Sequence, residues 1–78
     1  MKEFVAYVAK ALVEAPDEVV VVDGQVDADG RHVIELRVAV DDRGKVIGKK
    51  GRVAHNMRTL LAAASPADQP VTLDIVDL

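Results

Sequence analysis

The sequence contains no cysteine and no tryptophan, and it has one phenylalanine, one tyrosine and two histidines. The lack of cysteine excludes a disulfide framework, a thiolate zinc site and a cysteine nucleophile. The longest apolar run, residues 4–9, is far shorter than the ~20 residues that a membrane-spanning helix needs. We therefore expect a protein without metal, cofactor or membrane segment.

The length of 78 residues fits one small domain covering residues 1–78. A chain this short needs a dense apolar core, and half of its residues are hydrophobic, mostly valine and alanine. The N-terminal apolar run is bounded closely by Glu3 and Lys10, and no cleavage site of small residues follows it. These features predict a soluble cytoplasmic domain without a signal peptide.

The net charge of −3 conceals an uneven distribution. The segment from Arg43 to Arg58 contains six basic residues and no acidic residue, whereas the rest of the chain contains four basic and thirteen acidic residues. A local positive field on an acidic body can steer a polyanion to one surface. The distribution favours a nucleic-acid partner, although the protein as a whole is acidic.

Hydrophobic periodicity predicts the secondary structure. Residues 2–14 form an expected amphipathic helix that Pro16 ends, with an apolar stripe of Phe4, Val5, Val8 and Leu12. Residues 19–26 fit a strand with a bulge near Gly24, and turn residues 27–30 lead into a second strand over 32–40. In that second strand the residues expected to share one face are Ile34, Leu36, Val38 and Val40.

The second half of the chain predicts two helices and a strand. A short helix over 43–47 has Asp42 as its expected N-cap, and Gly48 ends it. A longer helix begins at Gly51 and ends at Ser65-Pro66, with an apolar stripe of Val53, Met57, Leu60, Leu61 and Ala64. Residues 71–75 alternate as a final strand. The expected fold is α+β in the order αββααβ, with a three-stranded sheet and helices packed on one face.

The segment Gly48-Lys49-Lys50-Gly51 lies between two predicted helices. Glycines at both ends allow a sharp turn and let backbone N–H groups approach a ligand closely. The helix that follows directs its free N–H groups and partial positive charge into the same loop, where the two lysines add charge. This combination suits a phosphodiester backbone. Two glycines at this spacing are common in turns, so the pattern alone is not specific.

The run from Lys45 to Val53 resembles the signature of K-homology (KH) domains, in which a hydrophobic pair precedes a GxxG loop between two helices. The order αββααβ is that of the type II KH fold, and the resemblance extends over the whole chain. The sequence is most similar to the small bacterial single-KH proteins of the KhpA family. Ala54 departs from the pattern, because many KH domains carry a larger aliphatic residue there.

The resemblance implies binding of single-stranded RNA, with the GxxG loop clamping about four nucleotides. Gly48, Lys49, Lys50 and Gly51 would hold the sugar-phosphate backbone. Lys45 belongs to the same basic segment, Val46 and Ile47 would form an apolar groove floor, and Arg52 and Asn56 would flank the groove. For Val46 and Ile47, packing in the core is an equally good interpretation. Contacts of His55 and Arg58 with RNA are left open.

Three functional classes remain for comparison. The first is an RNA-binding module that acts as an RNA chaperone or post-transcriptional regulator. The second is a protein–protein adaptor whose loop binds little RNA. An enzyme is not expected, because the chain has one serine and no cysteine, and its glycine spacing does not fit a P-loop. The resemblance also implies a homodimer, or a heterodimer with a larger KH-domain RNA-binding protein.

Overall fold

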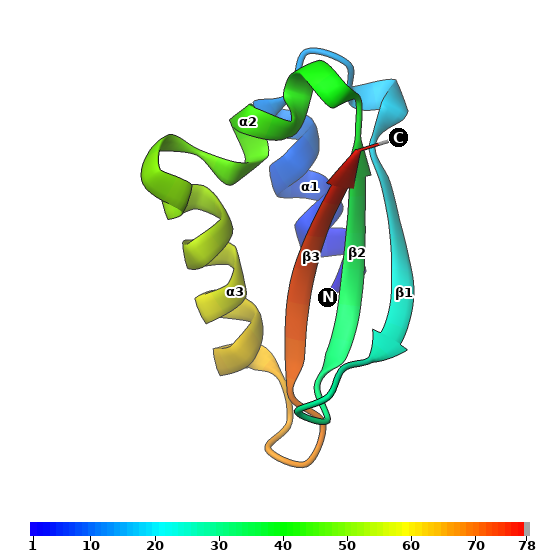
Figure 1. Ribbon diagram of the computed structural model, residues 1–78, viewed down its shortest axis with the longest axis vertical. Helices are drawn as coiled ribbons and strands as arrows, with labels where there is room; N and C mark the ends of the chain where they lie inside the picture. Colours follow the sequence, from blue (N-terminus) through cyan, green and yellow to red (C-terminus); the bar gives the residue numbers. More distant parts are fainter. Residues whose placement is uncertain (78) are drawn as a thin grey trace.

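The structure, a computed structural model, describes residues 1–77 (Figure 1). Residue 78, the last of the predicted domain, lies outside the described residues. The helices and strands follow the expected order αββααβ and are α1 (Lys2–Leu12), β1 (Val20–Val26), β2 (His32–Val38), α2 (Arg43–Ile47), α3 (Arg52–Ala64) and β3 (Val71–Asp77). In the described part of the chain, every helix is too short or too polar to cross a membrane.

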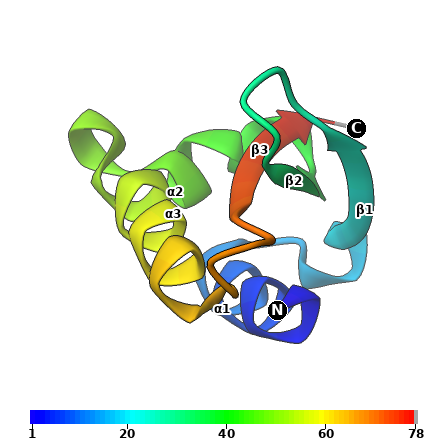
Figure 2. The same cartoon turned by 90° about the horizontal axis from the view of Figure 1, so that it is seen from below.

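The three strands form one sheet in the order β1-β2-β3. β1 pairs with β2 in antiparallel fashion, and β2 pairs with β3 in parallel. The register shifts between Asp23 and Val26, which confirms the irregularity expected near Gly24. The three helices lie on the same side of the sheet (Figure 2). The predicted α+β architecture is confirmed.

The core lies between this helical layer and the sheet. Three of the four alternating residues of the second strand, Ile34, Leu36 and Val38, are buried, as the period of two requires. Each helix buries part of its apolar side against the sheet, and Leu73 and Ile75 of β3 complete the core cluster. The buried helical residues are Val5, Ala9, Val46, Ala54, Met57 and Leu61.

Two predicted elements end earlier than expected. β2 stops at Val38, and a short 3-10 turn over Val40–Asp42 leads into α2. Val40 is therefore 62% exposed rather than on the buried face of the strand, because the chain has already turned. α1 ends at Leu12, and the next residue, Val13, is extended on the approach to Pro16.

Part of the predicted apolar stripes lies outside the core. Phe4 and Leu12 of α1 are 41% and 39% exposed, and Leu60 of α3 is 54% exposed. A periodic pattern shows which side of a helix is apolar, but the breadth of its burial depends on what packs against it. Here α1 and α3 leave an apolar groove of about 240 Å³ between their exposed edges, lined by Met1, Phe4, Leu60, Leu61 and Ala64.

Candidate nucleic-acid interface

The loop between α2 and α3 has an unusual backbone. Gly48 has φ 81°, Lys50 has φ 56° and Gly51 has φ 75°, so three of its four residues have positive φ. The N–H of Gly51 donates to the carbonyl of Gly48 at 3.0 Å, and the N–H of Arg52 donates to the carbonyl of Lys49, so residues Lys49–Gly51 form a short 3-10 turn. Lys50 is the one non-glycine residue with positive φ among the described residues. Strain of this kind often occurs at binding sites.

The two glycines of the loop serve different purposes. A Cβ built on Gly48 would lie 2.5 Å from Cγ2 of Val53 and 2.9 Å from the backbone nitrogen of Val53. Gly48 is therefore required both by its φ and by the close approach of the first turn of α3. A Cβ on Gly51 would meet nothing within 4 Å, so only the φ of Gly51 favours glycine.

The charged side chains of the loop are exposed and free of acidic partners. Lys49, Lys50 and Arg52 all face solvent, and no carboxylate among the described residues pairs with them. α3 begins here without a side-chain cap, so the N–H groups of its first turn, apart from that of Arg52, which donates to Lys49, also point into the loop. Backbone donors, a helix N-terminus and unpaired cations thus meet at one surface, which is the arrangement that binds phosphate.

The hydrophobic pair before the loop is split between core and surface. Val46 is completely buried in the core cluster, so its side chain supports α2 from beneath. Ile47 is partly buried and packs against the edge of the same cluster. Of the two residues considered for a groove floor, Ile47 is the one whose side chain reaches the surface beside Gly48.

Asp42 occupies the N-cap position of α2, as the sequence predicts, but its side chain makes no capping hydrogen bond. Its carboxylate instead accepts the backbone N–H groups of Glu14 and Ala15, each at 3.1 Å, from the segment that follows α1. The N–H of Glu14 is the main cause that holds the pKa of Asp42 below its usual value, and Lys45 contributes as well. Asp42 is 3% exposed and ties the start of α2 to the end of α1.

Lys45 differs from the loop lysines because it has an acidic neighbour, with its Nζ 3.5 Å from Oδ1 of Asp42. Its charge is therefore partly neutralised within the protein, in contrast with the charges of Lys49 and Lys50. Arg52 and Asn56 are exposed on successive turns of α3, as expected, and His55 is exposed beside them.

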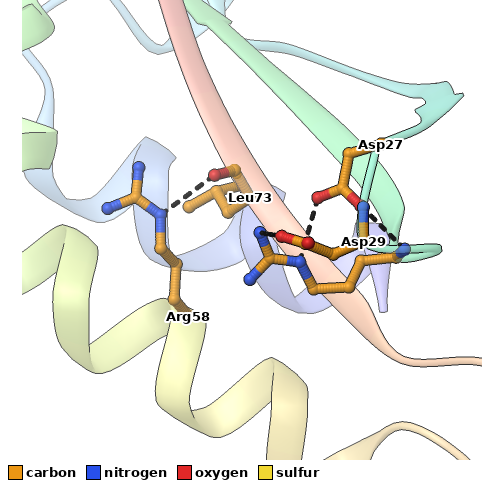
Figure 3. A network of polar contacts seen from close by, with 5 residues as sticks. Asp27, Asp29, Arg58 and Leu73 are labelled. Carbon is orange, nitrogen blue, oxygen red and sulfur yellow. Dashed lines mark hydrogen bonds and ion pairs between the residues drawn. The ribbon is translucent and has the colours of Figure 1, made fainter.

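A second feature lies further along α3, where the sequence leaves it open whether Arg58 contacts RNA. Arg58 reaches across to β3, and its Nε donates to the carbonyl of Leu73 at 3.0 Å (Figure 3). A cavity of about 250 Å³ lies between α3, the start of β3 and Arg31. In the sequence Arg58 stands out only as part of the basic segment, and Arg31 is 27 positions away, so periodicity could not place them together.

The described residues contain no group of three or more histidine, cysteine, aspartate or glutamate side chains that could hold a metal ion. The candidate interface is the loop between α2 and α3 together with the exposed residues at the start of α3. Its groups are hydrogen-bond donors and cations, with little that could act as a nucleophile or general base.

Comparison with known proteins supports the same interpretation. Residues 2–75 match the family described as "KhpA/KhpB, KH domain". The chain is 47% identical to the RNA-binding protein KhpA of Treponema pallidum over 97% of this chain and 94% of that protein. It is 43% identical to KhpA of Clostridium acetobutylicum, with 97% and 100% covered, and 47% identical to that of Halalkalibacterium halodurans, with 99% and 100% covered. These relatives are named as RNA-binding proteins, which agrees with the expectation of a non-enzymatic domain.

Proposed function

The chain belongs to the KhpA/KhpB family of KH domains, and from this premise we propose that it binds single-stranded RNA through the loop between α2 and α3. The observation that carries the proposal is the loop itself. Lys49 and Lys50 stand exposed and unpaired between two positive-φ glycines, at the uncapped N-terminus of α3. The relatives compared above are named as RNA-binding proteins over nearly the same length.

In the proposed complex, the RNA backbone lies against the loop. Gly48 and Gly51 allow the close approach, while Lys49 and Lys50 follow the phosphates. Arg52 and Asn56 flank the strand from α3, and Ile47 offers an apolar contact for a base. Val46 supports this surface from the core, and Lys45 contributes less than the loop lysines because Asp42 shares its charge.

A matched pair of charge reversals tests the proposal. Lys49→Asp and Lys10→Asp change the net charge equally, but Lys10 is an exposed residue of α1 and not part of the loop. Lys49→Asp should weaken binding of a short single-stranded RNA about tenfold or more. The slope of the logarithm of the binding constant against the logarithm of the salt concentration should also become shallower by ~0.7 for each phosphate that the variant no longer binds. Lys10→Asp should change neither quantity much.

The double variant Lys49→Asp with Lys50→Asp extends this test. Its helical content and melting temperature should stay close to those of the wild type, because neither lysine contacts the core. RNA binding that survives the double reversal would contradict the proposal. It would favour the adaptor function, in which the domain contacts proteins and the loop plays little part.

We further propose that the bound RNA serves a chaperone or post-transcriptional role in the cytoplasm. The site has no phenylalanine, tyrosine or tryptophan on which bases could stack, since Phe4 and Tyr7 both lie on α1. Each stacked base would add ~1–3 kcal/mol, so binding without stacking is weak and tolerant of sequence. Such binding suits a protein that acts on many transcripts.

We also propose that the domain works as a pair, either with a second copy or with a larger KH-domain protein. The apolar groove between α1 and α3 supports this, because Phe4 and Leu60 leave large apolar side chains in solvent beside it. Joining two weak RNA sites raises avidity by ~10²–10⁴ when both sites engage one strand.

Sedimentation across a concentration series measures the association. Leu60→Glu should shift the protein toward monomer, because it places a charge in the apolar groove, whereas Tyr7→Glu should not. Tyr7 is 73% exposed on α1 and does not line the groove, so it is a matched control. A wild-type protein that stays monomeric at high concentration, and whose RNA affinity a larger KH-domain protein leaves unchanged, would rule out the pairing.

A further inference from the structure

The sheet has an outer face, the side that points away from the helices. All three helices lie on the other side (Figure 2), so within residues 1–77 no helix covers it. The strand register identifies its residues, because directly paired residues point to the same side of a sheet. Leu36 is buried on the helical side, so its neighbours Glu35 and Arg37 point outward together with the residues that pair with them.

The outer face is rich in valine. Residues 19–22 are four consecutive valines. Val21 packs against the core, whereas Val20 and Val22 pair with Arg37 and Glu35 and therefore lie on the outer face, where Val20 is 41% exposed. A strand with one face in solvent normally alternates apolar and polar residues, and an unbroken apolar run is typical of a strand covered on both faces. The sequence of β1 therefore indicates a further layer over the outer face.

The charged residues of the outer face lie in two neighbouring rows that cross the strands. The acidic row consists of Val22, Glu35 and Asp74, and the basic row consists of Val20, Arg37 and Val76. A terminal nitrogen of Arg37 donates to Glu35 at 3.1 Å. Asp74 is exposed, and no basic residue in the described part of the chain pairs with it. The face thus carries both signs of charge in a fixed order along the strands.

This order makes the outer face complementary to itself. A second copy can be turned by half a turn about an axis that crosses the strands at the level of Leu36. The two sheets then pack face to face with antiparallel strands, and the acidic row of each copy meets the basic row of the other. Glu35 faces Arg37 of the other copy, and Val22 faces Val20. An axis parallel to the strands would instead place like charges opposite each other.

We propose that the outer face of the sheet is an interface with a second copy of this chain, packed in this antiparallel arrangement. The inference goes beyond the proposed function, because it requires neither RNA nor the groove between α1 and α3. It adds a second two-fold interface on the opposite side of the sheet from the helices, so assemblies larger than a dimer become possible. Each copy would bring its own loop to the same RNA strand, which raises avidity.

The test uses Leu60→Glu as the background, so that the groove between α1 and α3 no longer contributes. Sedimentation equilibrium gives the dissociation constant for self-association, and this protein should still form dimers. Arg37→Glu places carboxylates of the two copies opposite each other and should raise the dissociation constant about tenfold or more. Lys10→Glu makes the same change of charge at an exposed residue of α1 and should have little effect.

A mixing experiment separates charge complementarity from damage to the fold. In the same background, Glu35→Arg gives a face with two basic rows, and Arg37→Glu gives a face with two acidic rows. Each variant alone should associate weakly, because like charges meet. A mixture of the two should form a one-to-one complex at least as tight as the background dimer, because every acidic row then faces a basic row.

A pair of valine variants tests the apolar part of the interface. Val20→Thr replaces a methyl group on the outer face and should raise the dissociation constant about fivefold. Val26→Thr is the matched control on the same strand. Val26 is 55% exposed, but it pairs with His32, which places it on the helical side of the sheet. This control should leave self-association unchanged.

Three results would overturn the inference. The first is a Leu60→Glu protein that stays monomeric at millimolar concentration. The second is a mixture of Glu35→Arg and Arg37→Glu in which both folded variants remain apart. The third is an outer face that binds a larger KH-domain protein but no second copy, with Arg37→Glu weakening only that complex, because the occupant would then be a different protein.

Discussion

Asp42 precedes the N-terminus of α2, and its buried carboxylate accepts hydrogen bonds from the segment after α1. The C-terminus of α2 is followed by an exposed loop with positive φ angles and unpaired lysines. The two ends lie only a few residues apart, because α2 covers just Arg43–Ile47. A helix this short has little stability of its own.

The difference shows how a strained binding loop can be kept in place. The loop itself makes few stabilising contacts, so its position depends on what fixes α2. Val46 in the core and Asp42 at the N-terminus of α2 supply that support. The buried, hydrogen-bonded N-terminus of α2 therefore holds the exposed loop after α2 in a geometry that the lysines alone would not maintain.

The largest effect should come from removing the steric fit of the loop. Gly48→Ala combines an unfavourable positive φ with a clash against Val53, and it should lower the free energy of unfolding by about 3 kcal/mol. Gly51→Ala, with the same kind of φ and open space around its Cβ, should cost only about 1–2 kcal/mol. Urea unfolding of both variants measures the difference.

A third variant separates the two causes at Gly48. In a Val53→Ala background, the clash at the side chain is reduced while the φ remains positive. Gly48→Ala should then cost less than it does in the wild type. Equal costs for Gly48→Ala and Gly51→Ala would show that packing of Val53 against the loop is unimportant.

The next largest effect on stability should come from Asp42 at the buried N-terminus of α2. Asp42→Asn leaves one acceptor where the carboxylate offered two, so one of the N–H groups of Glu14 and Ala15 would lose its partner. The melting temperature should fall by about 10 °C. Asp41→Asn changes an exposed neighbour and should leave the melting temperature nearly unchanged.

The same variant should alter the pH dependence of stability. Because the folded-state pKa of Asp42 lies below its usual value of 3.8, the ionised carboxylate stabilises the fold above that pH. This contribution is lost as the pH falls below 3.8 and through the folded-state pKa. Asp42→Asn should therefore show a smaller loss of stability in that acid range. An identical acid profile for the variant and the wild type would exclude the role of Asp42.

The smallest effect should come from relieving strain in the loop. Lys50→Gly removes the cost of positive φ at a non-glycine residue, and it should raise the free energy of unfolding by no more than about 1 kcal/mol. RNA binding should weaken, because a charge is removed and the loop becomes more flexible. Chemical unfolding and RNA titration of the same sample measure both changes. A variant that loses stability would show that the Lys50 side chain makes a contact important to the fold.

The helices and strands were predictable where hydrophobic periodicity and turn or capping residues in the sequence agreed. The alternation of Ile34, Leu36 and Val38 identified β2, but it could not show that the strand ends before Val40. That end depends on the turn over Val40–Asp42, which tertiary packing of α2 requires. The apolar stripe of α3 was recognised as well, although Leu60 lies in solvent, because no neighbour covers that edge of the helix.

The sequence alone determined the features that depend on near neighbours in the chain: the periods of the helices and strands, the glycine-bounded loop and the cluster of positive charge around it. The tertiary structure alone decided the contacts between distant segments. Asp42 meets Glu14 across 28 positions, and Arg58 meets Leu73 across 15. A repeating pattern reports which side of an element faces the core, because that preference is set by hydrophobicity. It carries no information on which polar groups two packed elements bring within hydrogen-bonding distance, because that depends on how the elements pack together.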